Sequence, residues 1–133
     1  MRLYCDSVIL IYYFEGAPVF QARARSRLAA MWAAGDILVT SDLVRLECRM
    51  HPLRLGNAVR LADYDNLFGQ PNVERLSITT AVFDRATLLR AAHNFKLADS
   101  LHLATAIEGG CDRFLTNDTR LSRCTDITVE VLP

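Results

Sequence analysis

Residues 97–118 constrain the fold of this chain more than any other stretch of the sequence. A mostly apolar segment of helical length has Asp99 near its start and two consecutive glycines at its end, and a short apolar run at 113–116 then leads to Asp118. Glycine commonly ends helices because it adopts left-handed backbone angles at little cost, and a short apolar run between turn residues is typical of a buried strand. The stretch therefore predicts a helix and then a strand, with one carboxylate at the start of the helix and another beyond the strand.

Apolar runs alternate with helical segments along the rest of the chain as well. We predict strands at 3–5, 37–40, 73–78 and 128–132, and helices at 8–14, 24–32, 42–50, 53–68 and 80–93. Val59 and Phe83 are expected among the inward-facing residues of the last two helices. Strands that are apolar throughout are typical of parallel sheets covered on both faces, and parallel neighbours are joined by right-handed crossovers. The predicted fold is α/β, a three-layer α/β/α sandwich with a central, mostly parallel sheet of four to five strands and 128–132 at its edge.

Length and composition narrow the possibilities further. A chain of 133 residues is expected to form one domain, residues 1–133. Its 15 Lys and Arg residues balance its 15 Asp and Glu residues, so any basic surface for nucleic acid must be local. The four cysteines show neither a C-x-x-C pair nor zinc-type spacing, which indicates reduced thiols and a cytoplasmic protein. The apolar run at 8–14 is too short to span a membrane, so we expect no membrane partner.

Asp6 follows the first predicted strand directly. The carboxyl ends of parallel strands meet at one crevice of an open sheet, so an acid at this position can meet acids from other strand ends. The alternative is that Asp6 only caps the helix that follows it. Position alone leaves both interpretations open.

Glu47 stands where an apolar side chain is expected. Leu43, Leu46 and Met50 recur at helical spacing, and Glu47 falls within the same stripe, which we expect to face inward. Its alternatives are a buried ion pair with an arginine such as Arg60, or a place at the wet edge of the stripe.

Asp99 is expected to point into the fold. Ser100 and Glu108 are the residues that mark a solvated arc on its helix, and Asp99 lies off that arc. A buried carboxylate needs a partner, and a metal ion is a leading candidate.

Four acids thus share a position at or near the carboxyl ends of predicted strands: Asp6, Glu47, Asp99 and Asp118. Two carboxylates about 4 Å apart repel by about 4 kcal/mol at an effective dielectric constant of about 20, so a cluster needs protonation, basic partners or a divalent cation. Oxygen ligands favour Mg²⁺ or Mn²⁺ over Zn²⁺. The reaction that such a site favours is phosphodiester hydrolysis.

Four motifs also occur in the order and at the spacing of a known family. They are Asp6-Ser7 with the stretch 8–16, Ser41 with Glu47, residues 98–106, and residues 114–118. The chain resembles the PIN-domain nucleases over nearly its whole length, and in particular the VapC-type toxins of toxin–antitoxin pairs.

The resemblance implies an endoribonuclease toxin that uses Mg²⁺ or Mn²⁺ to cut RNA, is silenced by a cognate antitoxin protein, and forms a homodimer. The catalytic and metal-binding residues carried over by position are Asp6, Glu47, Asp99 and Asp118, the last binding metal directly or through water. Ser7 and Thr116 would orient water or a carboxylate. Val8 departs from the family, which often has a small polar residue there, and Asn117 precedes Asp118 where some relatives shift the acid by one position.

Other polar residues near the acids have less specific interpretations. Arg45 and Arg49 lie four residues apart and flank Glu47, so they could grip RNA phosphates or orient the glutamate. His102 lies one helical turn after Asp99, and a lone histidine on a largely buried helix is expected to pack or to hydrogen-bond.

Two other functions compete with the nuclease. A phospho-acceptor receiver domain would need a lysine after the last strand and an aspartate at the end of the third strand, whereas the only lysine, Lys96, precedes a helix. A catalytically inactive PIN-fold binding module would share the fold and would have lost its metal site, which the four acids argue against.

Overall fold

The sheet contains five strands and all of its strand pairs are parallel. The computed structural model describes residues 1–133, and its sheet has the strand order β3-β2-β1-β4-β5. The strands are β1 (Arg2–Cys5), β2 (Ile37–Ser41), β3 (Val73–Leu76), β4 (Arg113–Thr116) and β5 (Thr128–Val131). The predicted α/β sandwich is therefore confirmed, with β5 at an edge as expected and β3 shorter than its apolar run suggests.

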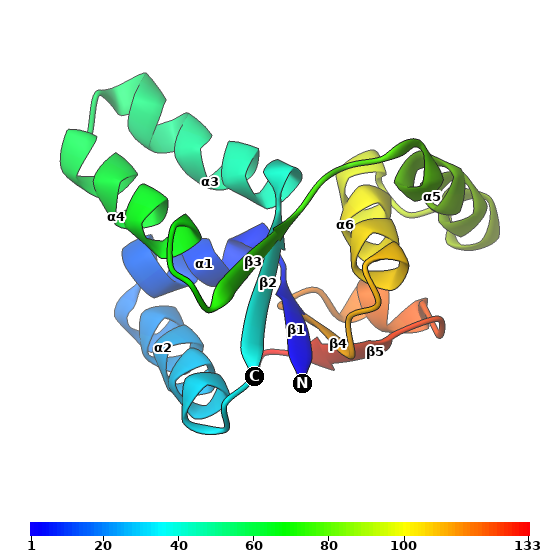
Figure 1. Ribbon diagram of the computed structural model, residues 1–133, viewed down its shortest axis with the longest axis horizontal. Coiled ribbons are helices and arrows are strands. Elements are labelled where there is room, and N and C mark those ends of the chain that lie inside the picture. Colours follow the sequence, from blue (N-terminus) through cyan, green and yellow to red (C-terminus); the bar gives the residue numbers. More distant parts are fainter.

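Six helices cover the sheet on two sides. They are α1 (Ser7–Glu15), α2 (Pro18–Ala33), α3 (Asp42–Leu55), α4 (Ala58–Phe68), α5 (Thr80–His93) and α6 (Leu97–Glu108), and a 3₁₀ turn, η1 (Thr119–Arg123), precedes β5. Figure 1 shows α1 to α4 on one side of the sheet and α5 and α6 on the other. No helix combines the length and the apolar character that a membrane crossing requires.

The order of the strands creates a crevice beside β1. The chain winds from β1 outward through β2 to β3 with α1 to α4 on one side, then returns across the sheet to β4 through α5 and α6 (Figure 1). The direction of winding therefore reverses between β1 and β4. In open α/β sheets this reversal leaves a crevice outside the carboxyl ends of the two strands, where ligands commonly bind.

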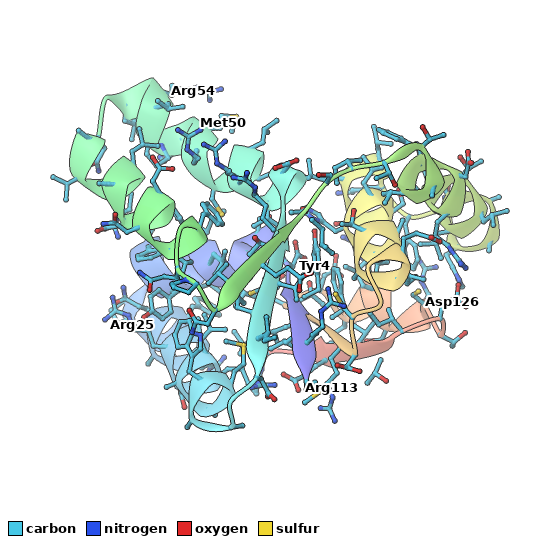
Figure 2. The ribbon with its side chains drawn as sticks, viewed as in Figure 1. Tyr4, Arg25, Met50, Arg54, Arg113 and Asp126 are labelled. Carbon is cyan, nitrogen blue, oxygen red and sulfur yellow. The ribbon has the colours of Figure 1, made fainter.

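The inward face of α3 differs from the expected one. Its buried residues are Val44, Cys48 and Pro52, and the helix continues through Pro52 to end before Gly56, whose φ of 66° is left-handed. Leu46 and Met50 are 61% and 48% exposed, and Figure 2 shows Met50 on the outer side of the helix. The predicted inward stripe is therefore wrong, because two apolar stripes run along this helix and the one with the smaller side chains packs against the core.

Two other inward-facing predictions are wrong. Val59 on α4 is 76% exposed and Phe83 on α5 is 52% exposed. The buried positions of α5 are Val82, Ala86 and Leu89, which follow the same helical period without Phe83. Apolar side chains thus remain at the surface on both sides of the sheet.

Candidate metal centre

Asp6 is placed by the pairing of β1 with β4. Its backbone N–H donates to the carbonyl of Leu115 at 2.9 Å, which extends the ladder one residue past β1. The side chain is buried and makes no capping hydrogen bond to α1. It accepts a hydrogen bond of 2.8 Å from the hydroxyl of Thr116 at the end of β4. The Asp6 carboxylate therefore faces the crevice between the two strands, and the helix-cap interpretation does not hold for its side chain.

Glu47 reaches the same crevice from α3. Its Oε1 accepts a hydrogen bond of 3.2 Å from the hydroxyl of Ser7 and a second one from Nε2 of His102. Arg60, the suggested ion-pair partner, instead lies near Glu15 and Asp63. Glu47 is partly exposed, at the wet edge of the helix face that α3 buries.

His102 joins Glu47 to the core. The ring is 2% exposed, and its Nδ1 lies 2.8 Å from the hydroxyl of Tyr4, which in turn lies 2.7 Å from the hydroxyl of Ser41. A carboxylate only accepts hydrogen bonds, so Nε2 carries the hydrogen that Glu47 receives. Nδ1 pairs with the hydroxyl of Tyr4, which completes the chain of hydrogen bonds from Glu47 to Ser41. Both ring nitrogens are engaged, so His102 fixes Glu47.

The sequence interpretation of His102 anticipated hydrogen bonding but missed its partner. Nε2 also lies 3.9 Å from Oδ1 of Asp6. The available signal was the position of His102 one turn after Asp99, since side chains three residues apart share a helix face.

Asp99 and Asp118 are the other two predicted acids, and they lie at the starts of α6 and η1. Asp99 lies in the first turn of α6, is half-buried, and accepts no hydrogen bond. Ser100 was predicted to mark a solvated arc beside Asp99, and this prediction is wrong, because Ser100 is buried and donates to the carbonyl of Leu97. Asp118 caps η1 and is paired with the guanidinium of Arg120, with a shortest contact of 2.6 Å.

The charges of the four acids act on one another. Burial raises the pKa of Asp6, and the charge of Glu47 raises it further against opposing effects of His102 and Thr116. Burial also raises the pKa of Asp99, with added repulsion from Asp6 and Asp118. The acids therefore form one electrostatically coupled group, in which ionising Asp6 and Asp99 is less favourable than usual.

The other two acids are stabilised in their ionised form. Burial raises the pKa of Glu47, but its hydrogen bonds with His102 and Ser7 outweigh burial, and the pKa lies below its usual value. Hydrogen bonds from Arg120 lower the pKa of Asp118. Glu47 and Asp118 thus each have a partner within the chain.

The acid set fits a hard divalent cation. Its donors are carboxylate oxygens, as Mg²⁺ and Mn²⁺ prefer, and a cation would relieve the repulsion that raises the pKa of Asp6 and Asp99. As the side chains stand, no three His, Cys, Asp or Glu residues converge on one point. This spread is expected of like charges whose nearest partners are His102 and Arg120, which hold Glu47 and Asp118.

The two arginines beside Glu47 differ in their contacts. Nε of Arg49 donates to Asp65 on α4 at 2.8 Å, which links the two helices. Arg45 is half-buried and forms no ion pair within the chain. Arg45 therefore remains the freer of the two to meet an external anion.

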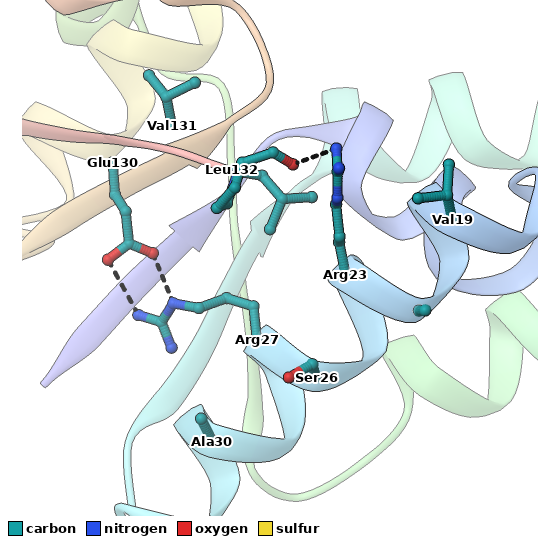
Figure 3. Close-up of a pocket in the computed structure, with 10 residues that line it drawn as sticks. Val19, Arg23, Ser26, Arg27, Ala30, Glu130, Val131 and Leu132 are labelled. Carbon is teal, nitrogen blue, oxygen red and sulfur yellow. Dashed lines mark hydrogen bonds and ion pairs between the residues drawn. The ribbon is translucent and has the colours of Figure 1, made fainter.

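A large surface cavity lies away from the acids. It measures about 650 Å³ and lies between α2 and the end of the chain. Its arginines have partners within the chain, since Arg27 pairs with Glu130 and Arg23 donates to the carbonyl of Pro133 (Figure 3). None of the four acids lines this cavity.

Comparisons with known proteins agree with this architecture. The family model of the PIN domain matches residues 3–126. Among solved structures, VapBC2 from Rickettsia felis, bound to a DNA fragment from its promoter, is similar with a TM-score of 0.80 at 15% identity, covering 100% of both chains. VapC20 of Mycobacterium tuberculosis, described as a toxin that cleaves the sarcin-ricin loop, gives 0.76 at 16% identity, covering 98% of this chain and 99% of that one.

A toxin–antitoxin complex from Klebsiella pneumoniae gives a TM-score of 0.74 at 18% identity and 96% coverage of each chain. At these identities the similarity shows a shared fold. No curated protein sequence matches the chain.

Proposed function

We propose that this chain, which belongs to the PIN domain family, is a divalent-metal-dependent endoribonuclease and the toxin of a toxin–antitoxin pair. The observation that carries the proposal is the coupled acid group at the crevice between β1 and β4. Buried carboxylates that repel one another are costly to keep unless a ligand uses them. The similarity of the fold, along the full chain, to a toxin described as cleaving the sarcin-ricin loop supports RNA as the substrate.

The roles of the acids follow from their positions. Asp6, Glu47 and Asp99 would hold Mg²⁺ or Mn²⁺, and Asp118 would bind it directly or through water once released by Arg120. A cation held there would polarise the scissile phosphate and would lower the pKa of an attacking water. Other residues of the chain position the acids by hydrogen bonds.

Three polar residues hold those acids in place. Thr116 donates to Asp6, and Ser7 and His102 donate to Glu47. Partners of this kind fix the orientation of metal-binding carboxylates, and their loss typically reduces metal affinity or activity tenfold or more. Arg45 is the candidate among the two α3 arginines for contact with an RNA phosphate.

Two protein partners belong to the proposal. The outer face of α3 carries the exposed side chains of Leu46, Met50 and Leu53. Adjoining apolar side chains at a surface commonly mark a protein interface, and these flank Glu47, so we infer that a segment of the antitoxin covers them and the acids. The solved toxin–antitoxin complexes with this fold support that partner. The other partner is a second copy of the chain, which would form a homodimer. Light scattering of the isolated protein would measure the mass of this dimer.

The test is cleavage of total RNA by the purified chain. With Mn²⁺ or Mg²⁺ we expect cutting at a few sites, and with EDTA or in the Asp99→Asn variant we expect none. A folded protein that neither binds Mn²⁺ nor cuts any RNA, including rRNA and tRNA, would contradict the nuclease proposal and favour the inactive binding module. The assay buffer should contain a reductant, because all four cysteines are free thiols. We infer that the protein is cytoplasmic.

A further inference from the structure

A second, smaller cavity opens directly beside the acids. It measures about 130 Å³ and lies between the start of α6, the loop before it, and η1. It is lined by Asn94, Phe95, Lys96, Asp99, Arg120, Leu121 and Arg123. Three of these side chains are cations, and the only anion among them, Asp99, belongs to the acid group. The cavity is therefore a basic recess that shares a wall with the candidate metal centre.

Arg123 is held in this recess by contacts that leave its charge free. Its guanidinium lies 5.0 Å from the centre of the ring of Phe95, which is buried. Its Nε donates to the carbonyl of Arg120 at 3.2 Å. A guanidinium has five N–H donors, and this one forms no ion pair within the chain. Stacking and one hydrogen bond thus orient a group whose remaining donors are available to an anion.

Arg120 and Lys96 face the acids from the same recess. Arg120 bonds both carboxylate oxygens of Asp118, at distances from 2.6 to 3.2 Å. Lys96 precedes α6, is exposed, and forms no ion pair. Its charge nevertheless contributes to lowering the pKa of Asp118, after the larger effect of the Arg120 hydrogen bonds. If Asp118 bound a cation at the metal centre, Arg120 would lose this partner and would become a third free charge beside Lys96 and Arg123.

We propose that Lys96, Arg120 and Arg123 form a subsite for a backbone phosphate of the RNA, next to the phosphodiester that the acids cut. The inference rests on the proposed function, because it assigns the anion to the substrate of that site. Size favours a phosphate, since a cavity of about 130 Å³ is smaller than the roughly 300 to 1,000 Å³ of pockets that hold drug-sized ligands. A nucleobase with its sugar needs more room.

Electrostatics also favour a substrate phosphate. The chain has no net charge, so it does not attract RNA as a whole, and the four acids repel it near the metal centre. Three cations at the wall of that centre offset the repulsion where the strand must enter. An acidic side chain of a protein partner is the other anion that fits, and the experiment separates the two.

The test uses the variants Arg123→Gln and Lys96→Gln, singly and together. Both leave the acids and Arg120 unchanged. The matched control is Arg25→Gln on α2, because Arg25 likewise stacks on an aromatic ring, that of Tyr13 at 5.3 Å, and donates to a backbone carbonyl at 3.1 Å. Thermal unfolding of each variant shows whether it is folded.

Binding of a 20-nucleotide single-stranded RNA is measured in EDTA, where nothing is cut, at several salt concentrations. Each phosphate contact to single strands contributes about 0.7 to the slope of log K against log salt. We expect the double variant to lose about 0.7 of that slope, and its KM for the cleaved RNA to rise about tenfold with kcat little changed. Arg25→Gln should match the unmodified protein.

An unchanged slope and KM in the double variant, or an equal change in Arg25→Gln, would overturn the subsite. Loss of antitoxin binding without any change in RNA binding would assign the recess to the protein partner and overturn it as well. If the unmodified protein cuts no RNA, the proposed function fails by itself, and the slope measured in EDTA still decides whether the recess binds phosphate.

Discussion

Replacing His102 with alanine separates its two roles, support of the core and positioning of Glu47. The ring is buried and joins the Tyr4 hydroxyl to Glu47. Losing the hydrogen bond to Tyr4 costs about 1 kcal/mol, and losing the bond to a charged carboxylate costs about 1.5 kcal/mol, at the low end because Glu47 can reach water. The space left by the ring adds about 1 kcal/mol. We therefore expect His102→Ala to lower the free energy of unfolding by about 3 to 4 kcal/mol.

The same substitution should weaken Mn²⁺ binding at least tenfold, because Glu47 loses the donor that orients it. The assays are urea unfolding in EDTA and calorimetric titration with Mn²⁺. Leu89→Ala on α5 is the control, since it removes a buried side chain away from the acids and should cost a similar 2 to 5 kcal/mol without changing Mn²⁺ affinity. If His102→Ala loses stability and binds Mn²⁺ as tightly as Leu89→Ala does, the positioning role is refuted.

Three further substitutions test other parts of the account. Asp99→Asn should raise the urea midpoint of the protein in EDTA, because burial and the neighbouring charges raise the pKa of Asp99 and make its ionised form costly; a lower midpoint would indicate a structural role. Hydrogen bonds from Arg27 lower the pKa of Glu130, so the stability from this pair is present above pH about 4.5 and is lost as the pH falls through the folded-state pKa. Arg27→Gln should accordingly cost about 1 kcal/mol at pH 7 and almost nothing near pH 2, measured by urea unfolding, and an equal loss at both would contradict this. Met50→Glu should weaken antitoxin binding at least tenfold in a titration, because it places a charge in an apolar interface, whereas Phe83→Glu at another exposed apolar position should not.

Much of the fold could be predicted because local pattern and topology agree. Apolar strands alternating with helices allow few arrangements other than a parallel sheet covered on both faces, and the acids at strand ends then meet at the reversal beside β1. Helix faces were less predictable. On α3 both the stripe with Leu46 and the stripe with Cys48 have helical spacing, and only packing decides between them: Cys48 lies with its sulfur 3.9 Å from the carbonyl of Ser7.

Two partners of the acids could not be predicted because they come from distant parts of the chain. His102 is separated from Glu47 by 55 residues, and no periodicity connects two side chains so far apart. Thr116 and Asp6 are 110 residues apart, and the resemblance to the family suggested a role for Thr116 without naming its contact. The pairing of Arg120 with Asp118 is local, two residues apart, yet it depends on the 3₁₀ turn, which the sequence did not indicate.

The most direct test of the central claim, that the coupled acids hold a divalent cation, is calorimetric titration of the metal-free protein with Mn²⁺ beside its Asp6→Asn variant. Asp6 is the most buried of the four acids, and the amide keeps its shape while removing its charge. We expect the unmodified protein to bind Mn²⁺ in the micromolar to low millimolar range and the variant to bind at least tenfold more weakly. Equal binding by the two proteins would contradict the assignment of this crevice as a metal centre.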